Sequence, residues 1–172
     1  MNSSFLNCRG AANKGMSTCL ADMINANELG FIGLQETMKE TYKPSFFRKI
    51  DPNQKFHWEW APSRGKSGGI LCGLSKDNFD ILMTKHGKYV LQLDLFDKNK
   101  SCSWVLIIVY GVAHDEQKPE FIVELSAMCH NTSKPYLVGG ILTSSVIVGR
   151  RIKKHLCPTS QMCLILPFTY LG

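Results

Sequence analysis

Short apolar runs separated by polar, glycine-containing or proline-containing turns make up most of the first 140 residues. Runs of this length, rich in β-branched, leucine and aromatic side chains, are typical of β-strands. Two longer segments, 14–26 and 119–130, instead repeat apolar residues at helical spacing. The predicted strands cover residues 5–9, 31–35, 56–60, 69–74, 79–84, 89–96, 104–110 and 136–138. This mixture predicts a strand-rich α/β domain.

The polarity within individual segments predicts their surroundings. The run 89–96 alternates leucine with Gln92 and Asp94, which is typical of a strand with one face in water. The run 104–110 is apolar throughout and rich in β-branched residues, so we expect a central strand that is covered on both faces. Residues 42–54 follow neither pattern and are predicted to form a polar loop.

Composition narrows the class of protein. A chain of 172 residues with 44% hydrophobic and 20% charged residues is long enough for one domain with a core. No apolar run approaches the length of a membrane span, and the first residues lack the charged and apolar parts of a signal peptide. We therefore expect an intracellular, non-secreted protein that does not enter a membrane. The seven cysteines are scattered and never spaced as Cys-x-x-Cys, which predicts reduced thiols.

The net charge of +6 belongs mostly to the C-terminal end of the chain. Residues 1–140 hold 16 of the 20 basic residues and all 14 acidic residues, a net of +2. Residues 141–172 hold the other four basic residues and no acidic residue. A net charge of +2 on the main body does not by itself indicate a protein that binds nucleic acid.

Polar side chains that can take part in catalysis or metal binding follow several predicted strands. Asn7 comes after the first strand, Glu36 after the second and Tyr110 after the central strand, while the last strand runs into Gly139-Gly140. Ligands of open α/β sheets gather at the carboxyl ends of strands. A carboxylate, an amide and a phenol together suit phosphodiester chemistry assisted by a divalent metal. Taken singly, Asn7 also reads as a turn residue and Tyr110 as a core aromatic residue.

The strings around these residues resemble the endonuclease/exonuclease/phosphatase superfamily, which has a DNase I-like fold. Within it, they are most similar to the endonuclease domain of plant LINE-type non-LTR retrotransposons. The resemblance covers residues 5–140, and six strings in the same order make it specific. They are Leu6-Asn7-Cys8-Arg9-Gly10, Leu34-Gln35-Glu36-Thr37, Ser67-Gly68-Gly69-Ile70-Leu71, Val109-Tyr110-Gly111, Lys118-Pro119-Glu120-Phe121 and Leu137-Val138-Gly139-Gly140.

The resemblance implies a fold and a site. The fold would be the N-terminal part of a four-layer α/β/β/α sandwich, with two mainly antiparallel or mixed β-sheets. Glu36 and Asn7 would hold Mg²⁺, and Tyr110 would lie near the scissile phosphate as the third catalytic residue. The reaction would be metal-assisted attack of water on a DNA phosphodiester, with DNA as partner, no small-molecule cofactor and a nuclear location. The resemblance leaves the oligomeric state open.

The sequence departs from the family where the last strand ends. The family has Gly-Asp-Phe-Asn there, and its Asp and Asn activate and orient the nucleophile. Here Gly140 is followed by Ile141-Leu142-Thr143. The family's later Asp and its general-base His also have no counterpart, because His155 lacks the Ser-Asp-His context. We therefore expect a catalytically inactive relative of the nuclease.

A shifted reading frame would explain this departure. With codons chosen to fit, deletion of one base from DNA that encodes Gly-Asp-Phe-Asn yields residues 140–153 as they stand. We thus interpret residues 1–140 as a partial nuclease domain and residues 141–172 as an aberrant, frameshifted tail.

Three functions fit the sequence. The first is an active magnesium-dependent nuclease or phosphatase, and the second is a truncated, inactive product of a LINE retrotransposon. The third is a noncatalytic module of the same fold that binds nucleic acid or protein. In the third case Arg9, Arg64 and Lys66 are the predicted contacts to DNA.

Overall fold

The computed structural model describes residues 2–8, 10–11, 15–26, 29–64, 68–112 and 115–141. They fall into two compact units, one within Met1–Phe79 and the other within Asp80–Phe168. No helix in these described ranges is long and apolar enough to cross a membrane. The domain boundary predicted after residue 140 stays a prediction.

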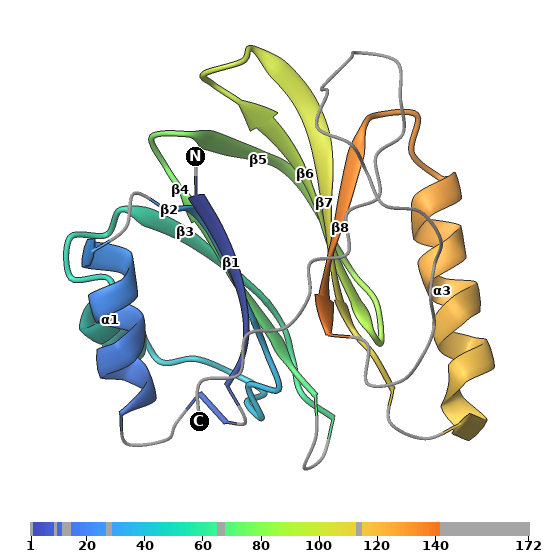
Figure 1. The fold of residues 1–172 in the computed structure, drawn as a ribbon, viewed down its shortest axis with the longest axis horizontal. Coiled ribbons are helices and arrows are strands. Elements are labelled where there is room, and N and C mark those ends of the chain that lie inside the picture. Colours follow the sequence, from blue (N-terminus) through green and yellow to red (C-terminus); the bar gives the residue numbers. More distant parts are fainter. Residues whose placement is uncertain are drawn as a thin grey trace. The chain divides into compact units, whose positions relative to one another are not determined.

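The first unit is a four-stranded sheet with two helices (Figure 1). Its elements are β1 (Asn2–Asn7), α1 (Met16–Ala26), β2 (Leu29–Gln35), α2 (Pro44–Ile50), β3 (Phe56–Ala61) and β4 (Ile70–Ser75). The strand order is β1-β2-β4-β3. The strands β1 and β2 run parallel, whereas β4 is antiparallel to β2 and to β3. The sheet is therefore mixed, and β1 and β3 are its outer strands.

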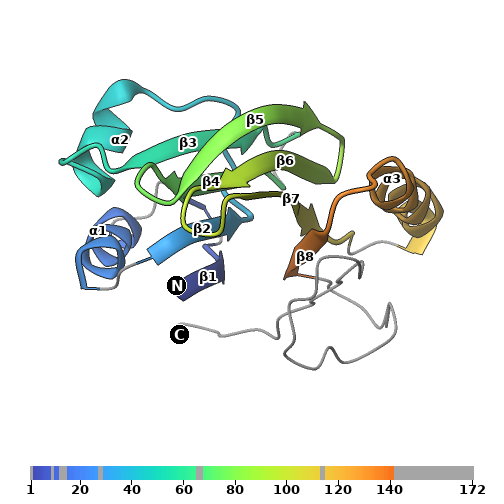
Figure 2. The ribbon, with the colours of Figure 1, turned by 90° about the horizontal axis from the view of Figure 1, so that it is seen from above.

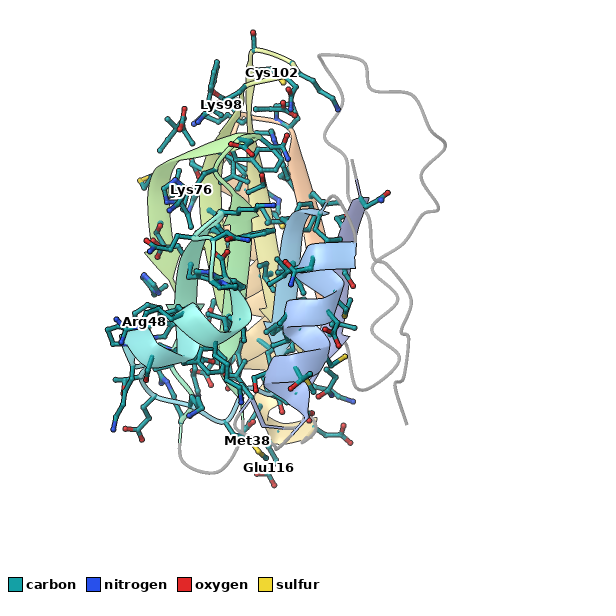
Figure 3. The ribbon with its side chains drawn as sticks, turned by 90° about the vertical axis from the view of Figure 1, so that its left-hand side faces the viewer. Met38, Arg48, Lys76, Lys98, Cys102 and Glu116 are labelled. Carbon is teal, nitrogen blue, oxygen red and sulfur yellow. The ribbon has the colours of Figure 1, made fainter. Side chains whose placement is uncertain are left out.

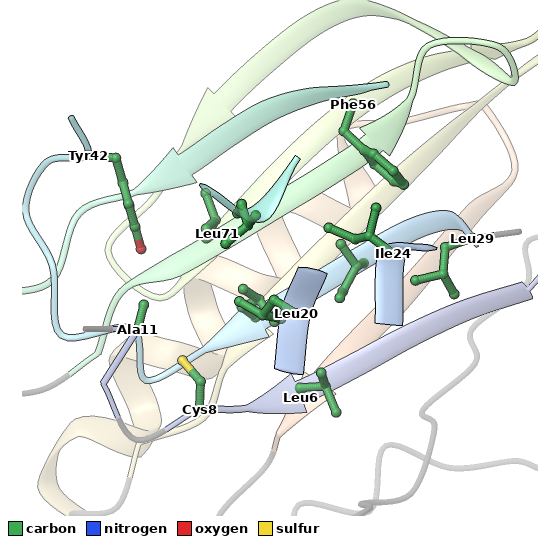
Figure 4. Close-up of a cluster of buried hydrophobic side chains, with 12 residues drawn as sticks. Leu6, Cys8, Ala11, Leu20, Ile24, Leu29, Tyr42, Phe56 and Leu71 are labelled. Carbon is green, nitrogen blue, oxygen red and sulfur yellow. The ribbon is translucent and has the colours of Figure 1, made fainter. Parts of the chain in front are cut away.

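Both helices of the first unit bury their apolar residues against this sheet (Figure 4). Leu20 and Ile24, four residues apart on α1, share a cluster with Ile50 of α2. The sheet contributes Leu34 and Leu71, which are register partners on β2 and β4. Since these five side chains are at most 7% exposed, they form the core that fixes the two helices on the sheet.

The helix α2 corrects the prediction of a polar loop over residues 42–54. Pro44 occupies the first turn, where its missing N–H costs no hydrogen bond. Phe46, Phe47 and Ile50 then face the core, while the residues between them are polar. Seven residues are too few for the apolar spacing to be recognised as helical. Packing of these three side chains stabilises a helix that the local sequence leaves ambiguous.

The strand β3 and the helix α2 are joined by aromatic rings and by one carboxylate. Trp58 stacks on Phe47, with ring centroids 5.6 Å apart and planes inclined by 28°. The buried Asp51, which follows α2, accepts hydrogen bonds from the backbone N–H groups of Lys55 and Phe56, each at 2.9 Å. It also accepts one from Trp58 Nε1 at 3.2 Å. The turn between α2 and β3 is therefore organised around Asp51.

The second unit contains the sheet β5-β6-β7-β8 and the helix α3 (Figure 2). Its elements are β5 (Phe79–His86), β6 (Val90–Asp97), β7 (Cys102–Tyr110), the short 3-10 helix η1 (Asp115–Gln117), α3 (Lys118–His130) and β8 (Tyr136–Ile141). The strand β7 is antiparallel to β6 and parallel to β8. Residues 105–109 of β7 are at most 2% exposed, which confirms the prediction of a covered central strand.

The prediction that β6 has one face in water is wrong. Gln92 and Asp94 are only 2% and 7% exposed. Gln92 Nε2 donates to Asp94 Oδ1 at 3.0 Å, and Lys134 Nζ donates to Asp94 Oδ2 at 3.0 Å. The alternation in the sequence marks two different faces, but the polar face is covered and its charge is neutralised by Lys134. Alternation alone does not separate a wet face from a buried polar network.

Candidate active site

Asn7 and Glu36 lie next to each other where β1 and β2 end. We call the line formed by the carboxyl ends of a sheet's parallel strands an edge of that sheet. Asn7 is the last residue of β1, and its register partner is Gln35, the last residue of β2. Because the two strands are parallel and about 4.8 Å apart, their carboxyl ends meet at the same edge. Glu36 follows Gln35 directly, and the side chains of Asn7 and Glu36 are both half-buried. The structure thus brings together the two predicted metal ligands.

The backbone of Glu36 is held by the segment that follows β1. The N–H of Gly10 donates to the carbonyl oxygen of Glu36 at 2.7 Å. The N–H of Ala11 donates to the carbonyl oxygen of Thr37 at 2.9 Å. The N–H of Cys8 donates to the carbonyl oxygen of Gln35 at 3.0 Å, which extends the ladder past the strand ends. Three hydrogen bonds from one neighbour therefore set the position of the Glu36 segment.

The turn before β4 holds the same segment from the other side. The N–H of Thr37 donates to Gly69 O at 3.2 Å, and that of Met38 donates to Gly68 O at 3.0 Å. Gly68 and Gly69 have φ angles of 82° and 86°, which favour glycine. A side chain at Gly69 would also bring a Cβ to 2.4 Å from Thr37 Oγ1. The positive φ angles thus favour glycine at both positions, and at Gly69 the nearby Thr37 side chain also leaves no room for a Cβ.

Glu36 and Met38 have left-handed backbone conformations, with φ angles of 54° and 53°. Non-glycine residues rarely adopt these angles, which cost about 1–3 kcal/mol each and persist only where the surroundings impose them. The hydrogen bonds on both sides of the segment impose them here. Met38 is 49% exposed and projects from this end of the unit (Figure 3). Two of the four non-glycine residues with positive φ in the described part of the chain lie in this segment, and such strain is common at functional sites.

The thiol of Cys8 supports the segment through a hydrogen bond. It is 2% exposed, and its Sγ donates to Gln35 O at 3.2 Å. Burial, with a smaller contribution from the charge of Glu36, raises the pKa of the Cys8 thiol to about 11. Because the thiolate is the form that binds metal, Cys8 stays a neutral donor. Sequence reasoning missed this role, for which the buried position directly after a strand was the available signal.

The predicted DNA contacts are only partly visible. The exposed Arg64 follows Ser63, whose N–H donates to Lys39 O at 2.9 Å, so the backbone beside Arg64 adjoins the segment that begins at Glu36. Arg9 and Lys66 lie outside the described residues. The three contacts to DNA stay predictions.

Tyr110 lies at the corresponding edge of the second sheet. It is half-buried and ends β7, and its register partner on β8 is Ile141. Position 141 is where the resemblance implies the catalytic Asp. The register partner of Tyr110 is therefore an isoleucine, a residue type without a side-chain oxygen. The role of Tyr110 in one site with Asn7 and Glu36 stays a prediction.

The donor atoms at the first edge fit a hard cation by type. The amide oxygen of Asn7 and the carboxylate of Glu36 are oxygen ligands, and Mg²⁺ is held by one or two carboxylates together with water. The described residues contain no group of three or more His, Cys, Asp or Glu that could hold a metal. Glu36 would supply the charged ligand and Asn7 a neutral one.

Solved structures share this fold, although no protein-family model and no curated protein sequence matches the chain. The endonuclease/exonuclease/phosphatase from Bacteroides vulgatus matches with a TM-score of 0.57 and 10% identity, over 84% of this chain and 66% of that one. The human Nocturnin catalytic domain matches with a TM-score of 0.57 and 10% identity, over 81% and 62%. D. rerio TDP2 complexed with a single-strand DNA product matches with a TM-score of 0.52 and 14% identity, over 74% and 52%.

These similarities confirm the predicted fold class. The chain has the α/β fold of DNase I-like endonuclease/exonuclease/phosphatase proteins, with two four-stranded sheets. It spans between half and two thirds of the length of the three structures. At 10–14% identity the likeness establishes the fold alone, so the LINE type, the metal and the reaction stay proposals.

Proposed function

We propose that this chain is a catalytically inactive relative of a Mg²⁺-dependent DNA endonuclease of the LINE retrotransposon type. The observation that carries the proposal is the contrast between two sheet edges. The edge with Asn7 and Glu36 carries two side chains with oxygen atoms and a strained, hydrogen-bonded backbone. The edge with Tyr110 carries Ile141 in place of an Asp.

The missing groups matter more than the retained ones. Bound Mg²⁺ would polarise a phosphoryl oxygen, and Glu36 and Asn7 would position it. Hydrolysis also needs a group that orients and deprotonates the attacking water, and loss of a general base typically costs 10²–10⁴-fold in rate. Ile141-Leu142-Thr143 contains no residue suited to that task. Glu36 and Asn7 would therefore position a metal without a residue at 141–143 that could deprotonate the attacking water, so we expect no hydrolysis.

A plasmid-nicking assay with Mg²⁺ tests this proposal. The wild-type chain and Glu36→Ala should give the same background of nicked plasmid, because the metal ligand no longer supports chemistry. Asn7→Ala should also match the wild type. Nicking by the wild type that is lost in Glu36→Ala would refute inactivity and favour an active nuclease.

The second candidate is a noncatalytic module that binds nucleic acid on the same fold. It is favoured by the DNA product bound to a structure of similar fold, and by exposed cations in the first unit. Salt-dependent binding of duplex DNA in the presence of EDTA would support this candidate. Absence of DNA binding at low salt would rule out this second candidate.

A further inference from the structure

Ion pairs are distributed unevenly over the described residues. The four salt bridges found there all lie in the second unit or at its border, and they are Lys88–Glu120, Lys98–Asp80, Lys118–Asp115 and Lys134–Asp94. Among the described residues, the exposed Lys43, Arg48, Lys49 and Lys55 of the first unit take part in none of these salt bridges. The charge of these four cations is therefore available to a partner.

The cations of the first unit are concentrated around α2. Phe46, Phe47 and Ile50 face the core, which turns Arg48 and Lys49 to the outside of the helix. Figure 3 shows Arg48 projecting away from the sheet. Both residues are exposed and lie in the last turn of α2, where cations are favoured by the helix dipole. One side of α2 is thus apolar and buried, and the other is cationic.

Two further cations extend this surface beyond the ends of the helix. Lys43 precedes α2 and is exposed. Lys55 is also exposed, and the hydrogen bond from its N–H to Asp51 keeps it at the carboxyl end of α2. Asp51 is the one acidic residue between positions 43 and 55, and it is 3% exposed and engaged by three donors. We call the four exposed cations Lys43, Arg48, Lys49 and Lys55 the α2 basic face.

We propose that the α2 basic face binds the phosphate backbone of duplex DNA. Seven helical residues span about 10 Å, and a duplex presents one negative charge per about 1.7 Å, hence about six charges over that length. The aromatic cluster beneath α2 holds the helix in place, so the cations need little reorganisation. The contact recognises charge and not base sequence. It is independent of the Asn7 and Glu36 edge.

The salt dependence of DNA binding, compared between variants, tests whether the α2 basic face makes this contact. The variant Arg48→Gln/Lys49→Gln removes two charges and keeps good helix-forming residues. Lys98→Gln/Lys100→Gln is the control for net charge, because it also removes two cations, here from the turn between β6 and β7, where Lys98 is paired with Asp80. Binding of a fluorescent 20-base-pair duplex would be measured over a range of salt concentrations in EDTA. Circular dichroism would verify that both variants fold.

The α2 variant should bind more weakly, and its slope of log affinity against log salt should be lower by about 2. The control variant should keep the wild-type slope. An equal loss in the α2 and control variants would overturn the proposal in favour of net charge. An unchanged slope in the α2 variant would also overturn it, as would binding of anionic phospholipid vesicles without binding of DNA.

Discussion

Glu36 combines a carboxylate with a backbone conformation that a residue with a side chain rarely adopts. Its position at a strand end was predictable, because an apolar run precedes it directly. Its φ angle of 54° was not, since it depends on hydrogen bonds to segments distant in the sequence. Gly10, Gly68 and Gly69 carried the available signal, because glycines allow such close backbone approach.

The strain at Glu36 predicts different stabilities for two variants that both lack the carboxylate. Glu36→Gly should be more stable than Glu36→Ala by about 1 kcal/mol, because only glycine adopts the left-handed conformation without cost. Urea unfolding of the two variants measures this difference in the free energy of unfolding.

The same pair of substitutions at Glu59, inside β3, provides the control. Its backbone is extended, so Glu59→Gly should be less stable than Glu59→Ala by about 0.5–1 kcal/mol. The same sign of the glycine–alanine difference at both positions would rule out backbone strain at Glu36.

The helix α2 shows what sequence patterns leave out. Phe46, Phe47 and Ile50 form one apolar side of a helix, but the segment is too short and too polar to be distinguished from a loop. What selects the helix is contact with residues elsewhere, including the stacking of Phe47 on Trp58. By contrast, the long helix α3 and the apolar strand β7 were predicted, because each carries a sufficient pattern within itself.

Asp51 should control the connection of α2 to β3. Asp51→Ala leaves the N–H groups of Lys55 and Phe56 and the Trp58 indole without their acceptor, which should cost about 3 kcal/mol. Asp51→Asn keeps one acceptor oxygen and should cost less. Urea unfolding followed by tryptophan fluorescence would measure both values. A cost below about 0.5 kcal/mol for the alanine variant would show that the turn does not depend on Asp51.

The buried network on β6 predicts a pH dependence of stability. Burial raises the pKa of Asp94, but hydrogen bonds from Gln92 and Lys134 and the charge of Lys134 outweigh it and hold the pKa below its usual value. A depressed folded-state pKa means that the carboxylate stabilises the fold above the unfolded-state pKa of about 3.9. This contribution is lost as the pH falls through the folded-state pKa.

The free energy of unfolding of the wild type should therefore exceed that of Asp94→Asn near neutral pH, and the gap should shrink below about pH 4. Unfolding curves at several pH values would measure the gap. The exposed Asp77→Asn serves as the control for removal of a surface charge. A gap for Asp94→Asn that stays constant across this pH range would contradict the assignment.

The fold of the described residues was predictable because six strings between residues 5 and 140 lie in the order of one family, although each string alone is weak. Strand order and register within each sheet were not, since they arise from pairing between distant segments. The chemistry follows a different rule from the fold. In the proposed function the architecture is kept because burial of apolar strands does not depend on catalytic groups, whereas the residues after Gly140 no longer supply those groups.

Cleavage of a labelled DNA duplex with protein in excess and Mg²⁺ present tests the central claim most directly. With protein in excess, the DNA is bound even where the affinity is low, so the cleavage rate reports the chemical step. The wild type, Glu36→Ala and Asn7→Ala should give equal rates at the level of the buffer control. A wild-type rate clearly above that control, and abolished by Glu36→Ala, would contradict the account of a fold that has kept its metal-binding edge but not its catalysis.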